Sequence, residues 1–123
     1  VPVIGKVQTL DVTAIARAVE DYAARARSGA LKPKETHGGT FTITNHGTGG
    51  SLIATPIINQ PQSAILGLGK LQKRAVVSSR NGQDEIAIRP VCYVTLAIDH
   101  RVLDGFVANR FLSVFTRVLE NWS

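Results

Sequence analysis

The stretch Ile98-Asp99-His100-Arg101-Val102-Leu103-Asp104-Gly105 joins an alternating apolar run to an amphipathic run. The first pattern is typical of a strand and the second of a helix, so His100 is expected where a strand ends. A neutral imidazole titrates near physiological pH, and His100 can therefore take a proton from a thiol or alcohol and return it. On spacing alone a second interpretation stays open, in which His100 is a loop histidine and Asp104 caps the following helix.

Apolar residues on both sides of this stretch predict the remaining elements. A helix is expected from Gly105 to Trp122, where Val107, Phe111, Val114, Phe115, Val118 and Leu119 share one face. A second helix is expected from Leu10 to Ser28, with Asp11 or Thr13 at its start and Gly29 just after its end. Strands are expected at Val1–Lys6, Thr40–Thr44, Ser63–Leu71 and Val91–Ile98, and a hairpin at Lys73–Ser79 and Glu85–Arg89 around the turn Asn81-Gly82. This order indicates an α+β fold, a mixed β-sheet with helices packed on it.

Composition narrows the function class. The 123 residues are 44% hydrophobic, which is typical of a globular domain, and no apolar run is long enough for a transmembrane helix. The net charge of +5 suits an anionic ligand or an acidic partner, but no nucleic-acid-binding motif accompanies it. The N-terminus lacks the layout of a signal peptide, so we expect a cytoplasmic or mitochondrial-matrix protein that binds neither nucleic acid nor membrane.

Other residues that could carry chemistry have weaker patterns. The glycine-rich loop Asn45–Ser51 lets backbone N–H groups approach a ligand, but it has neither a P-loop ending nor dinucleotide-site spacing. His46 in this loop and His37 are too few to predict a metal site, and we expect His37 to be exposed and inert. Cys92 is the only cysteine and fits a strand pattern, so it is expected to be buried and not nucleophilic.

Three segments together resemble the catalytic domain of the dihydrolipoyl acyltransferases, which form the core of 2-oxo acid dehydrogenase complexes. They are Asp99–Gly105, Gly38-Gly39-Thr40-Phe41-Thr42-Ile43-Thr44-Asn45 and Pro56-Ile57-Ile58-Asn59. The His-x-x-x-Asp-Gly part is also similar to chloramphenicol acetyltransferase and other CoA-dependent acyltransferases. The resemblance implies a chloramphenicol acetyltransferase-like fold. It covers residues 1–123 but only the C-terminal half of the family's catalytic domain, so a partial domain is expected.

The resemblance also implies roles for individual residues. His100 matches the family's general base, and Thr44 matches a position, often serine, whose hydroxyl donates to the oxyanion. Asp104 matches an acidic position that orders the active-site loop through an arginine pair. Thr44, Asn45, Gly69 and Leu71 match positions that line the channel for coenzyme A. The implied reaction moves an acyl group between a dihydrolipoyl thiol and the CoA thiol without an acyl-enzyme, and no metal is implied.

The same resemblance implies an assembly. The family's active site lies between subunits of a homotrimer, with His100 and Thr44 from different chains, and trimers build a cubic or dodecahedral core. The implied partners are a lipoyl domain carried elsewhere and the decarboxylase and dihydrolipoyl dehydrogenase components. Two alternatives stay open: a truncated, non-catalytic scaffold fragment of that core, and another CoA acyltransferase of the chloramphenicol acetyltransferase type. The acyl group is not predicted.

Overall fold

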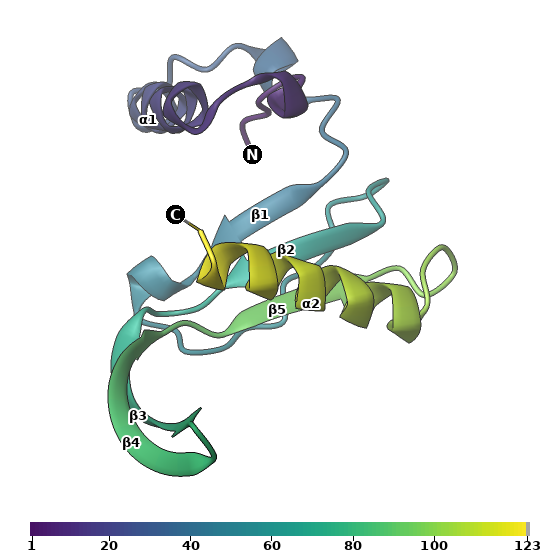
Figure 1. The fold of residues 1–123 in the computed structure, drawn as a ribbon. Helices are drawn as coiled ribbons and strands as arrows, with labels where there is room; N and C mark the ends of the chain where they lie inside the picture. The colour runs from purple at the N-terminus through teal and green to yellow at the C-terminus, as the bar shows by residue number, and fades with distance from the viewer. Residues whose placement is uncertain (123) are drawn as a thin grey trace. The chain divides into compact units, whose positions relative to one another are not determined.

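The computed structural model describes residues 1–122. They form two compact units, one of residues 1–40 and one of residues 41–122. The first unit holds one long helix and two short 3-10 helices, and the second holds five strands, one 3-10 helix and one long helix. Figure 1 shows the order of these elements along the chain. Each unit is described by itself below.

The first unit is built around helix α1 (Val12–Arg27), flanked by the 3-10 helices η1 (Val7–Thr9) and η2 (Pro33–Thr36). The side chain of Asp11 caps α1 by accepting the Ala14 N–H at 2.7 Å, and Gly29 follows in the left-handed region at φ 71°. The predicted helix is confirmed. The predicted strand Val1–Lys6 is wrong: no ladder forms there, and the segment is held instead by the Val3 N–H, which donates to the Glu35 carbonyl.

Arg25 ties the end of α1 to the connection after it. Its guanidinium donates to Asp21 and to both carboxylate oxygens of Glu35, at 2.8 to 2.9 Å. The hydrogen bond from the Lys32 N–H and those from Arg25 lower the pKa of Glu35, and its two carboxylate partners raise the pKa of Arg25. The ion pairs therefore fix the turn that follows the helix.

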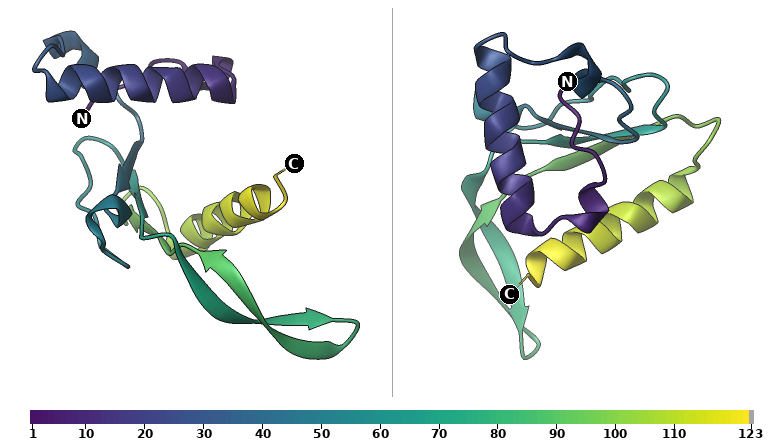
Figure 2. Two further views of the ribbon diagram at one scale, coloured as in Figure 1. Left: turned by 90° about the vertical axis from the view of Figure 1, so that its left-hand side faces the viewer. Right: turned by 90° about the horizontal axis from the view of Figure 1, so that it is seen from above.

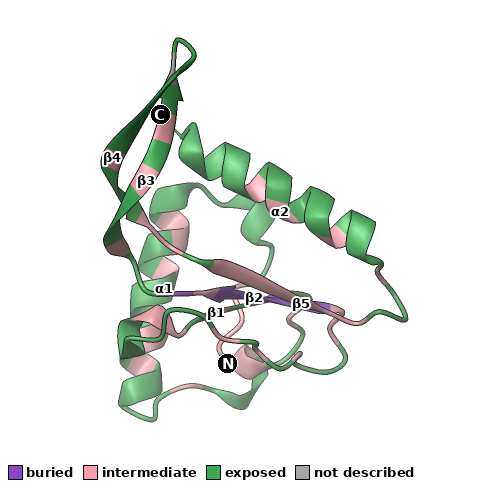
Figure 3. Cartoon of the chain, turned by 90° about the horizontal axis from the view of Figure 1, so that it is seen from below, coloured by how far each residue is buried: buried purple, intermediate pink, exposed green. Residues whose placement is uncertain are grey.

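The second unit contains a three-stranded mixed sheet in the order β1-β2-β5. Strand β1 (Thr42–Asn45) runs parallel to β2 (Ala64–Leu68), and β2 runs antiparallel to β5 (Val94–Ile98). The predicted strands at 40–44, 63–71 and 91–98 are confirmed, although each is shorter or shifted by a few residues. The buried side chains of this sheet are Thr42 on β1 and Ala64, Ile65 and Leu66 on β2. Figure 3 shows the buried colour on β1 and β2.

The predicted hairpin is confirmed as a separate two-stranded sheet. Strands β3 (Gln72–Arg80) and β4 (Gln83–Val91) pair antiparallel around Asn81 and Gly82. Both turn residues have positive φ, 53° and 78°, as a type I′ turn requires. The hairpin projects from the end of the β1-β2-β5 sheet, as the left view of Figure 2 shows.

Helix α2 (Gly105–Glu120) returns along the sheet after β5 (Figure 1). The Phe111 ring lies 5.9 Å from the Phe41 ring and 6.2 Å from the Phe115 ring, centroid to centroid. The helix ends at Glu120 rather than at the predicted Trp122, because Asn121 leaves helical geometry while its N–H still bonds the Arg117 carbonyl. Among residues 1–122 no helix is both long and apolar enough to cross a membrane.

Candidate active site

His100 lies in a tight turn between β5 and α2. Strand β5 ends at Ile98, and the Asp99 N–H donates to the Ser63 carbonyl beside the start of β2. The Asp99 carbonyl then accepts the N–H groups of both Val102 and Leu103, at 2.9 and 3.0 Å. His100 is exposed at the outside of this turn. The backbone therefore holds His100 in place and leaves its side chain accessible.

The neighbours of His100 form an ion pair that sequence reasoning missed. The Asp99 carboxylate accepts the Arg101 backbone N–H at 3.0 Å and the Arg101 side chain at 2.7 to 3.2 Å. These bonds lower the pKa of Asp99 to about 2, with the Arg101 side chain as the largest cause. The opposite charges at positions i and i+2 around His100 were the available signal. The ion pair links the residues before and after His100 and so stabilises the turn that carries the imidazole.

Asp104 caps α2, as the helix-cap interpretation predicted. Its carboxylate accepts the Val107 N–H at 2.8 Å. The arginine pair implied for Asp104 is not seen: among the described residues the only carboxylate that pairs with Arg101 is Asp99. The cap fixes the first turn of α2 directly after the His100 turn, and it complements the positive end of the helix dipole.

Thr44 and Asn45 lie at the end of β1. Thr44 pairs with Gly67 of β2, and Asn45 pairs with Leu68. The Asn45 side chain accepts the Thr48 N–H at 3.3 Å, so it closes the turn into the 3-10 helix η3 (Gly47–Gly49). Thr44 is half-buried. The strand thus presents its hydroxyl from a firmly paired position.

Gly69 is approached by the chain's own backbone. A Cβ built on Gly69 would overlap the Leu52 carbonyl oxygen and lie 3.1 Å from the Tyr93 carbonyl oxygen. A Cβ on Gly47 would in turn overlap the Gly69 carbonyl. The space beside Gly69 is therefore filled by the backbone of the chain itself, at Leu52 and at Gly47 of the glycine-rich loop. Leu71, in contrast, is 68% exposed and accessible to a ligand.

The sheet register separates Thr44 from His100 within one chain. Thr44 is level with Gly67, and Gly67 is level with Thr95 of β5. From Thr95 to the end of β5 at Ile98 the chain advances about 10 Å at the usual strand rise, and His100 lies two residues beyond. Figure 1 shows the end of β1 and the β5–α2 turn at opposite ends of the sheet. The two side chains of one chain therefore do not meet.

Two other candidates from the sequence, Cys92 and His37, each lie against a backbone carbonyl. Cys92 is half-buried, and its thiol donates to the Gly69 carbonyl at 3.0 Å. His37 is exposed, as predicted, and its Nδ1 lies 2.7 Å from the Pro33 carbonyl. Across residues 1–122 no group of three or more histidine, cysteine or acidic side chains is placed to hold a metal.

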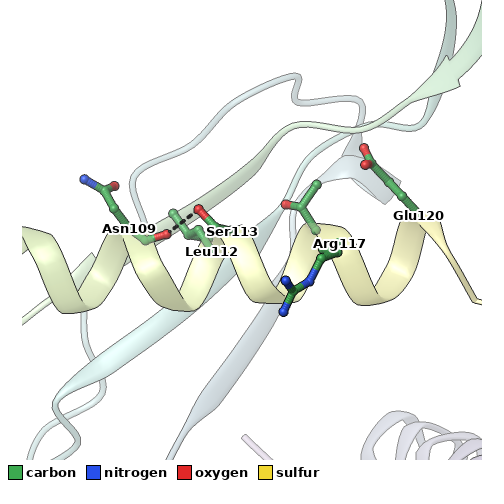
Figure 4. A pocket seen from close by; sticks show the side chains of 6 residues that line it. Asn109, Leu112, Ser113, Arg117 and Glu120 are labelled. Carbon is green, nitrogen blue, oxygen red and sulfur yellow. Dashed lines mark hydrogen bonds between the residues drawn. The ribbon is translucent and has the colours of Figure 1, made fainter.

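A shallow hollow along α2 contains none of the predicted site residues. It is lined by Asn109, Leu112, Ser113, Thr116, Arg117 and Glu120, and the Ser113 hydroxyl donates to the Asn109 carbonyl (Figure 4).

Residues 1–123 match the family model of the 2-oxoacid dehydrogenase acyltransferases (catalytic domain). The chain belongs to this family. The chain is 51% identical over 120 residues to the dihydrolipoyllysine-residue acetyltransferase component of the pyruvate dehydrogenase complex of Mycobacterium tuberculosis, a match that covers 97% of the chain and 22% of that protein. It is 44% identical over 121 residues to the dihydrolipoyllysine-residue succinyltransferase component of the 2-oxoglutarate dehydrogenase complex of Rickettsia typhi. This match covers 98% of the chain and 29% of that protein.

Solved structures of acyltransferases share the fold. A probable dihydrolipoamide acetyltransferase from Listeria monocytogenes matches with a TM-score of 0.91 and 38% identity, over 99% of this chain and 50% of that one. The cubic core of a pyruvate dehydrogenase complex matches with a TM-score of 0.89 and 32% identity, over 98% of this chain and 48% of that one. The dihydrolipoamide acetyltransferase of Azotobacter vinelandii, solved to study a serine, a histidine and an asparagine in its mechanism, matches with a TM-score of 0.88 and 33% identity. This match covers 98% of this chain and 48% of that one. The predicted acyltransferase fold is confirmed, and the chain spans about half of these solved chains.

Proposed function

We propose that this chain carries half of the active site of a CoA-dependent acyltransferase, which moves an acyl group between a dihydrolipoyl thiol and the thiol of coenzyme A. The observation that carries the proposal is the braced turn at His100. It exposes an imidazole between the Asp99–Arg101 pair and the Asp104 cap, on a chain of the acyltransferase family. Of the serine, histidine and asparagine studied in the Azotobacter relative, this chain has the histidine as His100 and the hydroxyl as Thr44, whereas Asp104 carries a carboxylate in place of an amide.

His100 serves as the general base in this proposal. It removes the proton of the attacking thiol, and the thiol sulfur then attacks the thioester carbonyl to form a tetrahedral oxyanion. A free thiol is about two pKa units less acidic than an imidazolium, so complete transfer in water is uphill by roughly 2.7 kcal/mol. Transfer that accompanies carbon–sulfur bond formation avoids this cost, and the imidazolium returns the proton to the leaving thiolate.

Thr44 serves as the oxyanion donor. Its hydroxyl can donate one hydrogen bond, as a serine would, while the β-branch narrows its rotamers. Because the register keeps Thr44 and His100 of one chain apart, we infer that each active site combines Thr44 of one subunit with His100 of another. A closed cyclic homotrimer is the assembly we expect, built further into a cubic or dodecahedral core.

Coenzyme A is placed at the Thr44 end of the sheet. Leu71 is exposed there and Asn45 closes the loop, whereas the Gly69 space is filled by backbone, so Gly69 contributes only by shaping the loop. The lipoyl group arrives on a separate lipoyl domain, and the decarboxylase and dihydrolipoyl dehydrogenase are the partner enzymes. The compartment, bacterial cytoplasm or mitochondrial matrix, stays a prediction, as does the assignment of residues 1–123 to the C-terminal half of the catalytic domain.

Thioester exchange tests the proposal. The protein would be mixed with CoA and acetyl-, succinyl- or isobutyryl-dihydrolipoamide, and acyl-CoA would be measured. We expect exchange with at least one donor that is abolished in His100→Ala and retained in the matched control His37→Ala. Exchange that survives His100→Ala would refute the role of the base. No exchange with any donor would favour the scaffold-fragment alternative.

A further inference from the structure

The imidazole of His46 is buried without a hydrogen-bond partner. Neither Nδ1 nor Nε2 is reached by solvent, and neither has a partner within the described part of the chain. The backbone N–H of His46 donates to the Leu68 carbonyl, so the residue itself is fixed against the end of β2. An unpartnered buried polar group is unfavourable, and its presence calls for a physical reason.

The surroundings of Gly67 show where the ring is held. A Cβ built on Gly67 would lie 3.3 Å from His46 Nε2, 3.3 Å from Pro56 Cγ and 2.6 Å from Thr95 Oγ1. The Thr95 hydroxyl is already committed, since it donates to the Ala54 carbonyl at 2.8 Å. The His46 ring therefore lies over the glycine, against the connector that contains Ala54 and Pro56.

The same row of the sheet contains Thr44. Thr44, Gly67 and Thr95 are direct register partners on β1, β2 and β5, so their side-chain positions face the same side. Neighbouring strands are about 4.8 Å apart, which puts the Thr44 side chain one strand away from the space that the ring occupies. His46 also follows Thr44 by only two residues. Any collapse of that space would move the end of β1.

We propose that His46 is a positioning residue for Thr44, and that it acts by the shape of its ring and not by its proton. This inference rests on the proposed function, because Thr44 is the oxyanion donor there. The ring keeps the end of β1 at a fixed distance from the connector at Pro56. Gly67 leaves room for the ring because it has no side chain. An apolar side chain of similar volume does the same work.

Kinetics of the full-length, assembled enzyme test this role. His46→Ala should lower kcat for thioester exchange about tenfold or more, while the KM for CoA stays within about twofold. A small displacement of the Thr44 hydroxyl weakens its hydrogen bond to the oxyanion and therefore slows the chemical step. His46→Leu should restore kcat and keep the wild-type pH profile. His37→Ala is the matched control for loss of a histidine. An unchanged kcat in His46→Ala, or a His46→Leu variant as slow as His46→Ala with a shifted pH profile, would overturn the proposal.

A second measurement does not depend on catalysis. Amide hydrogen exchange of residues 42–45 should be faster in His46→Ala than in wild type and near normal in His46→Leu, with trimer content checked by sedimentation. Gly67→Ala should speed the same exchange, since its Cβ would overlap the Thr95 hydroxyl and crowd the His46 ring. Unchanged exchange in His46→Ala would refute the positioning role even if the protein proves to be no acyltransferase, whereas loss of wild-type thioester exchange alone would refute only the proposed function.

Discussion

Thr44 combines a hydroxyl with a β-branched shape, and the two can be separated by substitution. Thr44→Val keeps the branch and removes the donor, so we expect kcat to fall by about 10²- to 10³-fold, the usual effect of losing one oxyanion donor. Thr44→Ser keeps the donor and should stay within a few-fold of wild type. Steady-state exchange kinetics measure both. Equal activity of the two variants would show that the hydroxyl takes no part.

Asp104 joins a structural and a functional role in one carboxylate. Asp104→Ala removes the bond to the Val107 N–H and should lower the free energy of unfolding by about 1 kcal/mol. It should also slow exchange, because the His100 turn ends at this cap. Asp104→Asn retains a capping oxygen and should recover the stability. Thermal and urea unfolding of the three proteins decide, and an Asp104→Ala variant with unchanged stability and activity would contradict both roles.

Sequence patterns predicted single residues unevenly. The Asp104 cap and the Gly29 helix end follow from local rules, and both are confirmed. The partners of Gly69 and the burial of His46 depend on how the loop at 45–54 folds back over β2, and no local pattern encodes that path. The functional roles of His100 and Thr44 came from the family resemblance and stay predictions.

The β5–α2 turn has a pH dependence that follows from Asp99. Its pKa is lowered to about 2 from an ordinary value of 3.8, so the pair with Arg101 contributes stability that is complete above about pH 4 and is lost as the pH falls toward 2. Urea unfolding midpoints at pH 5 and pH 2.5 should therefore differ less in Asp99→Asn than in wild type. Identical differences in the two proteins would mean that the pair adds nothing to stability.

The hairpin depends on a glycine that its turn requires. Gly82 has φ 78°, and an L-residue there costs about 1 kcal/mol or more. Gly82→Ala should lower the melting temperature, while Gly5→Ala, at a site with open space and no positive φ, should not. Calorimetry of both variants measures the difference. A Gly82→Ala protein as stable as Gly5→Ala would mean that the hairpin adds little to the unfolding transition.

Elements were predicted better where one pattern repeats. Both long helices and the hairpin have clear periodicity or a specific turn, and their positions are confirmed. Val1–Lys6 reads as a strand by apolar content alone, but Pro2 has no N–H to donate and Lys6 has φ 51°, so regular pairing is interrupted near both ends of the segment. Strand pairing is a property of two segments, and one segment's composition does not reveal it.

The whole molecule exposes much apolar surface. Val77, Ile86 and Ile88 lie on one face of the hairpin and are each 71 to 81% exposed. Phe106 in the first turn of α2 is 75% exposed, and Trp122 just beyond the helix is 65% exposed. Patches of this kind mark interaction surfaces. This agrees with the expectation that the chain works in an assembly, although its partners and their arrangement stay predictions.

Mixing of inactive variants tests the shared active site. Trimers reassembled from equal amounts of Thr44→Val and His100→Ala subunits contain both intact residues at about one quarter of their sites if each site spans two chains. We therefore expect about a quarter of wild-type activity to return, measured as acyl-CoA formation. Each variant reassembled alone is the control. A mixture as inactive as its components would place both residues of each site on one chain.

The two-residue turn at Asn81-Gly82 also has a consequence in time. The hairpin joins residues close in sequence, whereas β1 must find β2 across 18 intervening residues, from His46 to Ser63. Short loops close in tens of nanoseconds and hairpins form in microseconds, so β3 and β4 meet first during folding. An isolated hairpin is only marginally stable, however, and it persists only when the strands at its base are held. The strands at its base are β2 and β5, which pair with each other, so the hairpin becomes permanent only once these two strands have joined.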